Sequence, residues 1–124
     1  MIESIHNPQL KELRRIQARK VPGRFTCEGE DLVAAAAAHG WEPVQLLRAG
    51  VDVDERTLAR VSELGSGSRV IGVYEERWAL PVGPLCVALW GVGDPGNVGT
   101  ILRSAHALGA NCAAIGPRTA DPFA

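Results

Sequence analysis

Residues Gly91 to Ala110 read GVGDPGNVGTILRSAHALGA. The apolar run LCVALWGV leads into this segment, and a second apolar run, NCAAIG, follows it at 111–116. Unbroken apolar runs of this kind are typical of strands buried on both faces of a parallel sheet. Between them, apolar residues recur at helical spacing, at Val98, Ile101, Leu102, Ala105 and Leu108. The sequence therefore predicts a β-α-β unit over 85–116, with Asn97 as the N-cap of a helix from about Val98 to Leu108.

The first six residues of the quoted segment also satisfy the dinucleotide-binding pattern G-x-G-x-x-G. Three features weaken that interpretation. Gly96 is expected before the helix rather than inside it, and Pro95 removes a backbone N–H that should face phosphate. Gly116-Pro117-Arg118 stands where an acidic residue is expected after the second strand. An NAD-dependent oxidoreductase is therefore kept only as a remote alternative.

The residues before this unit alternate between strand and helix patterns. Asn7-Pro8 is a good helix start, and helices are also expected over 28–40 and from 54 onward. Strands are expected at 24–27, 43–50 and 69–74, which together predict an α/β fold. The segment PVGP at 81–84 is the expected boundary between domains 1–80 and 81–124. Two strands and one helix cannot cover a sheet, so either the N-terminal half completes that sheet or the chain is a piece of something longer.

Composition limits the classes of function. The 124 residues carry a net charge of −1, and no apolar run is long enough to span a membrane. The N-terminus has no apolar signal-peptide core, so a cytoplasmic location without membrane contact is expected. Three cysteines without C-x-x-C spacing argue against a disulfide framework or a zinc site, and no metal is expected.

Charge is distributed unevenly. Residues 1–24 hold only two acidic side chains, Glu3 and Glu12. The same stretch holds six basic ones: Lys11, Arg14, Arg15, Arg19, Lys20 and Arg24. Such a patch is either a contact surface for nucleic-acid phosphates or a solvated helix face.

Arg103 lies almost opposite the apolar face of the helix predicted from Val98 to Leu108. It therefore points away from the core, near the carboxyl end of a parallel strand, where α/β sheets place ligands. A guanidinium there suits a phosphate or a developing alkoxide, although a plain surface arginine is the commoner outcome.

Two segments carry a family resemblance. DPGNVGTILRSAHALGA resembles motif 1 of the SpoU (TrmH-type) RNA 2′-O-ribose methyltransferases of the SPOUT class, and Asn97, Gly99 and Arg103 match it position for position. The segment from Ser4 to Leu47 resembles the RNA substrate-binding domain of that family, which carries an F-x-x-E-G-x-x-L-V pattern. The residues that match this pattern are Phe25, Glu28, Gly29, Leu32 and Val33.

The resemblance implies a small α/β ribosomal-protein-like RNA-binding domain, followed by the first β-α-β unit of a SPOUT (α/β knot) methyltransferase domain. It implies S-adenosylmethionine as the methyl donor and RNA as the substrate, with ribosomal RNA as the expected target. It also implies a homodimer in full-length relatives. Arg103 would sit at the reactive centre and Asn97 would shape it. The six basic residues of 1–24 would hold RNA.

The chain departs from the family pattern in two places. Many relatives carry Asp where this chain has His106. The two later motifs that build the methyl-donor site are absent, so the chain is expected to be truncated after motif 1 and its cofactor-binding residues stay unknown. A non-catalytic RNA-binding module is the alternative to an enzyme.

Overall fold

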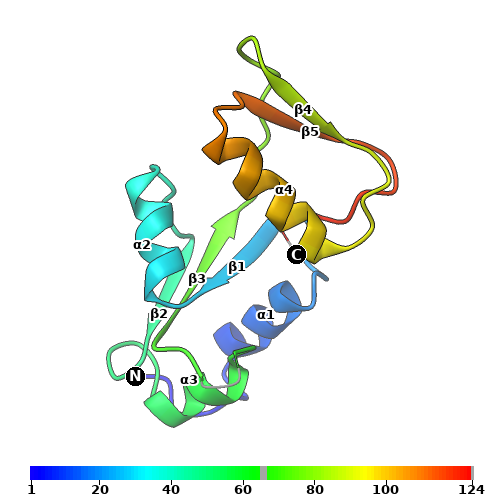
Figure 1. Ribbon diagram of the computed structural model, residues 1–124. Helices are drawn as coiled ribbons and strands as arrows, with labels where there is room; N and C mark the ends of the chain where they lie inside the picture. The colour runs from blue at the N-terminus through cyan, green and yellow to red at the C-terminus, as the bar shows by residue number, and fades with distance from the viewer. Residues whose placement is uncertain (65–66, 124) are drawn as a thin grey trace. The chain divides into compact units, whose positions relative to one another are not determined.

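The computed structural model describes residues 1–64 and 67–123. It divides into two compact units, Met1–Glu76 and the part from Arg77 onward (Figure 1). Each unit has its own β-sheet, so the described chain is a mixed α/β protein with two separate sheets. None of its described helices has the length and hydropathy that a membrane crossing requires.

The first unit is built on a three-stranded antiparallel sheet. Strands β1 (Arg24–Glu28), β2 (Gln45–Arg48) and β3 (Val70–Glu75) lie in the order β1-β3-β2. The helices are α1 (Pro8–Gln17), α2 (Glu30–Ala38) and α3 (Glu55–Val61). All six elements were predicted, with ends that differ by a few residues.

Helix α1 starts where the sequence predicts, because local chemistry fixes its start. The Asn7 side-chain oxygen accepts the Gln9 N–H at 2.9 Å, and Pro8 occupies the first helical position. The apolar side of α1 packs into the main core, which α3 and the sheet complete. Members of this core include Leu10, Leu13, Ile16, Leu47, Leu58, Val61, Ile71 and Val73. Tyr74, which alternates with Val73 along β3, lies on the opposite face of the sheet and lines a cavity with α2 residues.

The second unit contains a parallel strand pair joined by a helix, as predicted. Strands β4 (Cys86–Leu89) and β5 (Cys112–Ile115) pair in parallel, and α4 (Pro95–Ala107) connects them. The first unit does not complete this sheet: its strands form a sheet of their own. Of the two possibilities left open by the sequence, completion by the N-terminal half is therefore wrong for the described residues.

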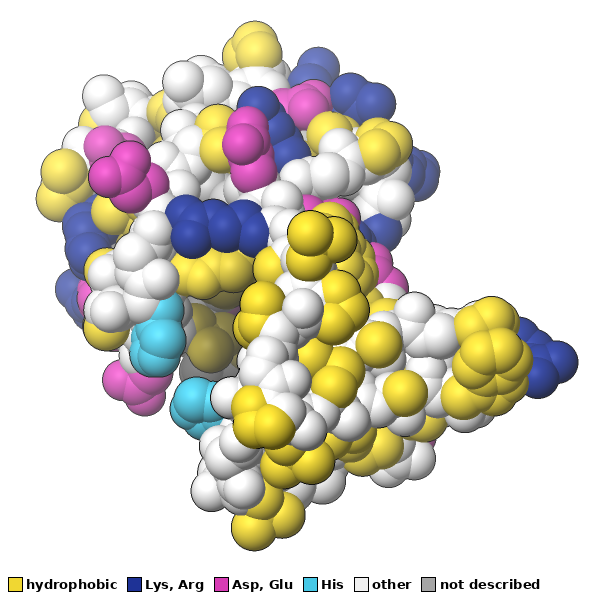
Figure 2. All heavy atoms as spheres, turned by 90° about the horizontal axis from the view of Figure 1, so that it is seen from above, with side chains coloured by type: hydrophobic (Ala, Val, Ile, Leu, Met, Phe, Trp, Pro, Cys, Tyr) yellow, Lys and Arg dark blue, Asp and Glu magenta, His cyan; other side chains and the backbone are white. Residues whose placement is uncertain are grey.

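The predicted burial of the second unit is wrong in part. Cys86 and Ala88 are exposed, whereas Leu89 and Val98 are buried. Leu108, expected on the apolar face of the helix, is 82% exposed and lies just past the end of α4. In β5 the adjacent Ala113 and Ala114 are both exposed as well, so neither face of this two-stranded sheet is fully covered by the described residues. Figure 2, which views the molecule from above, shows hydrophobic side chains gathered on the exposed surface.

Candidate functional site

Helix α4 begins three residues earlier than the sequence predicts. Its N-cap is Asp94, whose Oδ1 accepts the Gly96 N–H at 2.8 Å, and Pro95 is the first helical residue. Asn97 is therefore not the N-cap; it lies exposed in the first turn, and its backbone N–H donates to the Asp94 carbonyl at 3.1 Å. Asp and Asn cap equally well, and a proline directly after Asp94 favours the earlier start.

Arg103 is exposed, as predicted, and its side chain leans back toward the start of α4. The guanidinium Nη2 donates to Thr100 Oγ1 at 3.3 Å, and Thr100 Oγ1 donates to the Gly96 carbonyl at 2.9 Å. A Cβ on Gly99 would lie 3.7 Å from Arg103 Nη1, so the guanidinium passes over the glycine in ordinary contact. Among the described residues this is the one hydrogen bond of the Arg103 side chain, which leaves most of its N–H donors for a ligand.

Asn97 and Arg103 share a helix but not a helix face. They are six positions apart, which corresponds to roughly 120° around the axis and about 9 Å along it. Among the described residues, no hydrogen bond joins the side chains of Asn97 and Arg103. A ligand that touched both would have to wrap around the N-terminal half of α4.

The loops at the carboxyl ends of β4 and β5 are fastened to each other. The Gly91 N–H donates to the Pro117 carbonyl at 2.9 Å, and the Ala120 N–H donates to the Val92 carbonyl at 2.7 Å. Thr119 Oγ1 donates to the Leu89 carbonyl at 3.1 Å. Sequence reasoning missed this clamp, because nothing in the segment after β5 indicates its partners.

Trp90 is a further exposed residue at this end of the sheet. Its side chain is 68% exposed, and a Cβ on Gly116 would lie 3.0 Å from Trp90 Cε3 and 2.7 Å from the Leu89 carbonyl oxygen. Gly116 is therefore needed for the close approach of the two loops. Arg118, also exposed, follows in the same turn. The one sequence signal for Trp90 is an aromatic residue at the end of an apolar strand.

The start of α4 does not offer its backbone to a dinucleotide. Gly96 lies inside the helix, so the expectation that it precedes the helix is wrong. The Gly96 N–H nevertheless donates to the Asp94 side chain, and the Asn97 N–H donates to the Asp94 carbonyl. Pro95 has no N–H to donate. A pyrophosphate needs free N–H groups at this point.

Most of the basic residues between positions 11 and 20 are exposed on the first unit. Lys11, Arg14 and Lys20 are exposed, and Arg15 makes an exposed ion pair with Glu12 at 3.0 Å. An exposed pair of this kind contributes little to stability, so Arg15 can exchange Glu12 for another anion.

Arg19 and Arg24 are held more tightly. Arg19 Nη2 lies 2.5 Å from Glu76 Oε1, and Arg19 Nη1 donates to the Arg24 carbonyl, with the Arg19 side chain only 27% exposed. Arg24 is half-buried at the start of β1. The structure thus gives Arg19 a structural role within the first unit, which the sequence did not indicate.

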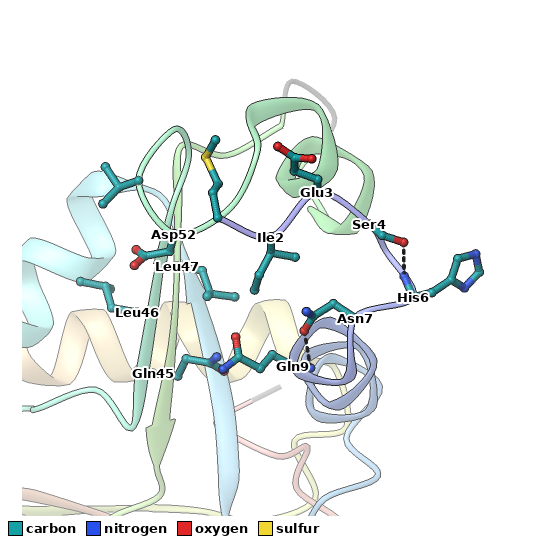
Figure 3. Close-up of a pocket in the computed structure, with 12 residues that line it drawn as sticks. Ile2, Glu3, Ser4, His6, Asn7, Gln9, Gln45, Leu46, Leu47 and Asp52 are labelled. Atoms are coloured by element: carbon teal, nitrogen blue, oxygen red, sulfur yellow. Dashed lines mark hydrogen bonds between the residues drawn. The ribbon is translucent and has the colours of Figure 1, made fainter.

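A groove of about 870 Å³ lies beside β2 and the N-terminal segment (Figure 3). The side chains of Gln9 and Gln45 point toward each other across it. Among the described residues that line it, Glu3 and Asp52 contribute carboxylates and none is Lys or Arg. The groove was not predicted, and its charge does not suit a phosphate.

Glu28, a matching residue of the F-x-x-E-G pattern, joins four parts of the first unit. Its carboxylate accepts hydrogen bonds from Ser62 Oγ, Ser68 Oγ and the Glu63 N–H, each at 2.8 Å, and from Gln17 Nε2 at 3.2 Å. Burial by itself would raise the pKa of Glu28, but these hydrogen bonds outweigh it and hold the pKa below its ordinary value of 4.5.

Glu28→Gln is expected to lower the free energy of unfolding by about 1–2 kcal/mol at pH 7, because an amide cannot accept all of these bonds. The folded pKa lies below the unfolded one, so the contribution of the carboxylate is complete above about pH 5 and is lost as pH falls through the folded pKa. Urea unfolding at pH 7 and pH 3 checks this: the gap between wild type and variant should close at the lower pH. Glu63→Gln is the matched control, since Glu63 contributes only its backbone N–H to this cluster. If the free energy of unfolding changed with pH in the same way for Glu28→Gln and wild type, the assignment would be contradicted.

The chain is similar to solved structures of RNA methyltransferases. No protein-family model matches the chain, and no curated protein sequence does. Solved structures match it along almost its whole length. An rRNA methyltransferase from Sinorhizobium meliloti is 29% identical with a TM-score of 0.83, and the match covers 98% of this chain and 56% of that one. That protein has also been solved with AdoMet bound.

Two further structures agree. An RNA 2′-O ribose methyltransferase is 26% identical with a TM-score of 0.70, covering 98% of this chain and 57% of its own. A TrmH-family protein from Porphyromonas gingivalis is 25% identical with a TM-score of 0.80, covering 97% and 55%. The chain therefore spans little more than half the length of the structures it matches.

Proposed function

We propose that the chain carries the RNA-handling part of an S-adenosylmethionine-dependent RNA 2′-O-ribose methyltransferase, because it resembles solved RNA methyltransferases along 97–98% of its length. Residues 1–80 are the RNA substrate-binding domain in this proposal, and residues 81–124 are the first part of the methyltransferase domain. The division of the structure after Glu76 lies close to that boundary and supports the assignment.

The finer features of the family complete the proposal. The first domain is ribosomal-protein-like, the second is the opening β-α-β unit of a SPOUT knot, the full-length protein is a homodimer, and it acts on ribosomal RNA in the cytoplasm. Two observations favour the assignment of the second domain to the opening of a SPOUT knot. Strands β4 and β5 are parallel, and their sheet has only two strands among the described residues. Such a pair needs further strands beside it to form a stable sheet.

The observation that carries the proposal is the position of Arg103. Its guanidinium is exposed, leans toward the start of α4, and keeps most of its donors free for an anion. A ribose hydroxyl is a poor nucleophile because its pKa is very high, so its reaction needs stabilisation of the negative charge that develops on oxygen. A planar guanidinium that binds the adjacent phosphate is suited to that task. Asn97, on a neighbouring face of the same helix, would contact the RNA from a second side.

The methyl donor has no assigned residues in this chain. When bound, it supplies the electrophilic methyl group. A cavity of about 330 Å³ in the second unit is lined mainly by apolar side chains, including Trp78, Leu102 and Phe123, with Arg77 and Asn111 as its polar members. That lining does not fit a ligand that carries a sulfonium, an ammonium and a carboxylate, since such a ligand needs several placed polar groups. We therefore derive no step through the donor.

Arg103→Ala is expected to make RNA binding less dependent on salt. Loss of one phosphate contact should reduce the slope of log affinity against log salt by about one, uniformly across RNA sequences. Arg103→Lys should restore the slope, because an ammonium also carries a single positive charge. Fluorescence anisotropy with a labelled RNA measures the slope, and His106→Ala on the same helix is the control. An unchanged slope in Arg103→Ala would remove Arg103 from the RNA site.

The alternative is an RNA-binding module without catalysis, and it is favoured by the coverage of only 56% of the S. meliloti structure. Calorimetric titration of the folded chain with S-adenosylmethionine separates the two. One-site binding supports the enzyme and places a donor site in residues not yet assigned. Absence of binding, together with salt-dependent RNA binding, supports the module.

A further inference from the structure

Cys86 and Cys112 begin the two strands of the second unit and lie directly opposite each other. They are register partners in the parallel β4–β5 pair. The Cys112 thiol donates a hydrogen bond to the Cys86 sulfur at a distance of 2.7 Å. Both cysteines are free thiols, and Cys86 is exposed to solvent. The cysteine count and spacing argued against a disulfide framework, and the 26 positions between Cys86 and Cys112 gave no sign of this pair.

The backbone around the pair is fixed from both sides. The Asn111 N–H donates to the Leu85 carbonyl at 2.8 Å, and the Leu85 N–H donates to Asn111 Oδ1 at 3.1 Å. These two residues directly precede the cysteines, so a reciprocal clamp and the strand ladder hold the two sulfurs together. The arrangement therefore does not depend on a mobile loop.

We propose that Cys86 and Cys112 form a site of reversible oxidation, at which a peroxide converts the two thiols into an intrachain disulfide. One thiolate attacks a peroxide oxygen; an S–O bond forms, the O–O bond breaks, and water leaves once protonated. The second sulfur then attacks the sulfenic sulfur, forming the S–S bond and expelling the hydroxyl as a second water. The sulfurs lose two electrons and the peroxide gains them. Paired cysteines on adjacent strands need only a small approach to reach disulfide geometry.

The site lies at the opposite end of the strand pair from the loops that carry Trp90 and the clamp to Pro117. Oxidation therefore joins the amino ends of β4 and β5 without touching Arg103 or its contacts. This inference does not rest on the proposed RNA function. Oxidation affects stability, because a covalent link between β4 and β5 constrains the unfolded chain and raises the thermal midpoint of the second unit.

The test is intact-mass spectrometry of the 124-residue chain after mild treatment with hydrogen peroxide. The monomer should become about 2 Da lighter, recover its mass with dithiothreitol, and melt at a higher temperature while oxidised. Cys27→Ser should behave as wild type. Cys27 lies in the first unit and stands opposite Gly72 in the β1–β3 pair, so it has no cysteine beside it with which to form this disulfide.

Cys86→Ser and Cys112→Ser should each abolish the lighter monomer, with circular dichroism used to confirm that both variants fold. Three results would overturn the proposal. They are a wild-type monomer that only gains oxygen, covalent dimers as the sole product on a non-reducing gel, and a lighter monomer that persists in either serine variant.

Discussion

Reversal of two charges on α1, with Lys11→Glu and Arg14→Glu, is expected to lower the affinity of the chain for RNA about 10²-fold. Each side chain is exposed and offers its charge to a phosphate. A hydrogen bond to a charged group contributes about 1.5 kcal/mol or more, and about 1.4 kcal/mol is a tenfold change in affinity. The slope of log affinity against log salt should also fall by roughly 1.4 for a single-stranded RNA, because two counterion-releasing contacts are lost.

The matched control reverses the same number of charges elsewhere. Arg56→Glu with Arg60→Glu on α3 changes net charge equally, and both arginines are exposed. Anisotropy titrations at low salt should give a much smaller loss for this pair. An equal loss for the two pairs would mean that RNA responds to overall charge and that α1 is not the contact surface. Arg24 is not used in the pair, because it is half-buried at the start of β1 and its replacement would also disturb the fold.

Gly72→Val is expected to destabilise the first unit by about 3 kcal/mol, the upper end of the cost of overpacking. A Cβ at this position would lie 2.7 Å from Tyr74 Cε2 and 2.8 Å from the Tyr74 hydroxyl oxygen. The ring cannot move cheaply, because Tyr74 is 1% exposed and stacks on Phe25 with a centroid distance of 5.7 Å. Urea unfolding measures the change in the free energy of unfolding.

A double-mutant cycle isolates the cause. In a Tyr74→Leu background the ring is gone, so Gly72→Val should cost clearly less than it does in wild type. The same cost in both backgrounds would show that the valine strains the backbone or another neighbour. Gly72 would then not be required by the Tyr74 ring.

The elements that sequence reasoning predicted are those whose signals are local. Asn7 and Pro8 fix the start of α1, and the periodic Leu10, Leu13 and Ile16 fix its buried side. The start of α4 was misplaced because Asp94 and Asn97 are both good caps, and only the position of Pro95 decides between them. The exposure of Arg103 followed directly from helical periodicity.

What the sequence could not predict depends on contacts between distant residues. Glu28 meets Ser62 and Ser68 only after β1, α3 and β3 have come together. Cys86 and Cys112 become neighbours only in the parallel register of β4 and β5. The exposed residues of that strand pair were expected to be buried, because an apolar run does not reveal how many layers cover a strand.

The most direct test of the account is the affinity of the wild-type 124-residue chain for RNA between 50 and 200 mM salt, a range over which about six to ten phosphate contacts change affinity 10³- to 10⁵-fold. Measurable binding at low salt is expected, with a linear fall of log affinity against log salt that corresponds to several phosphate contacts. A folded chain that does not bind RNA at low salt, or whose binding is indifferent to salt, would contradict it.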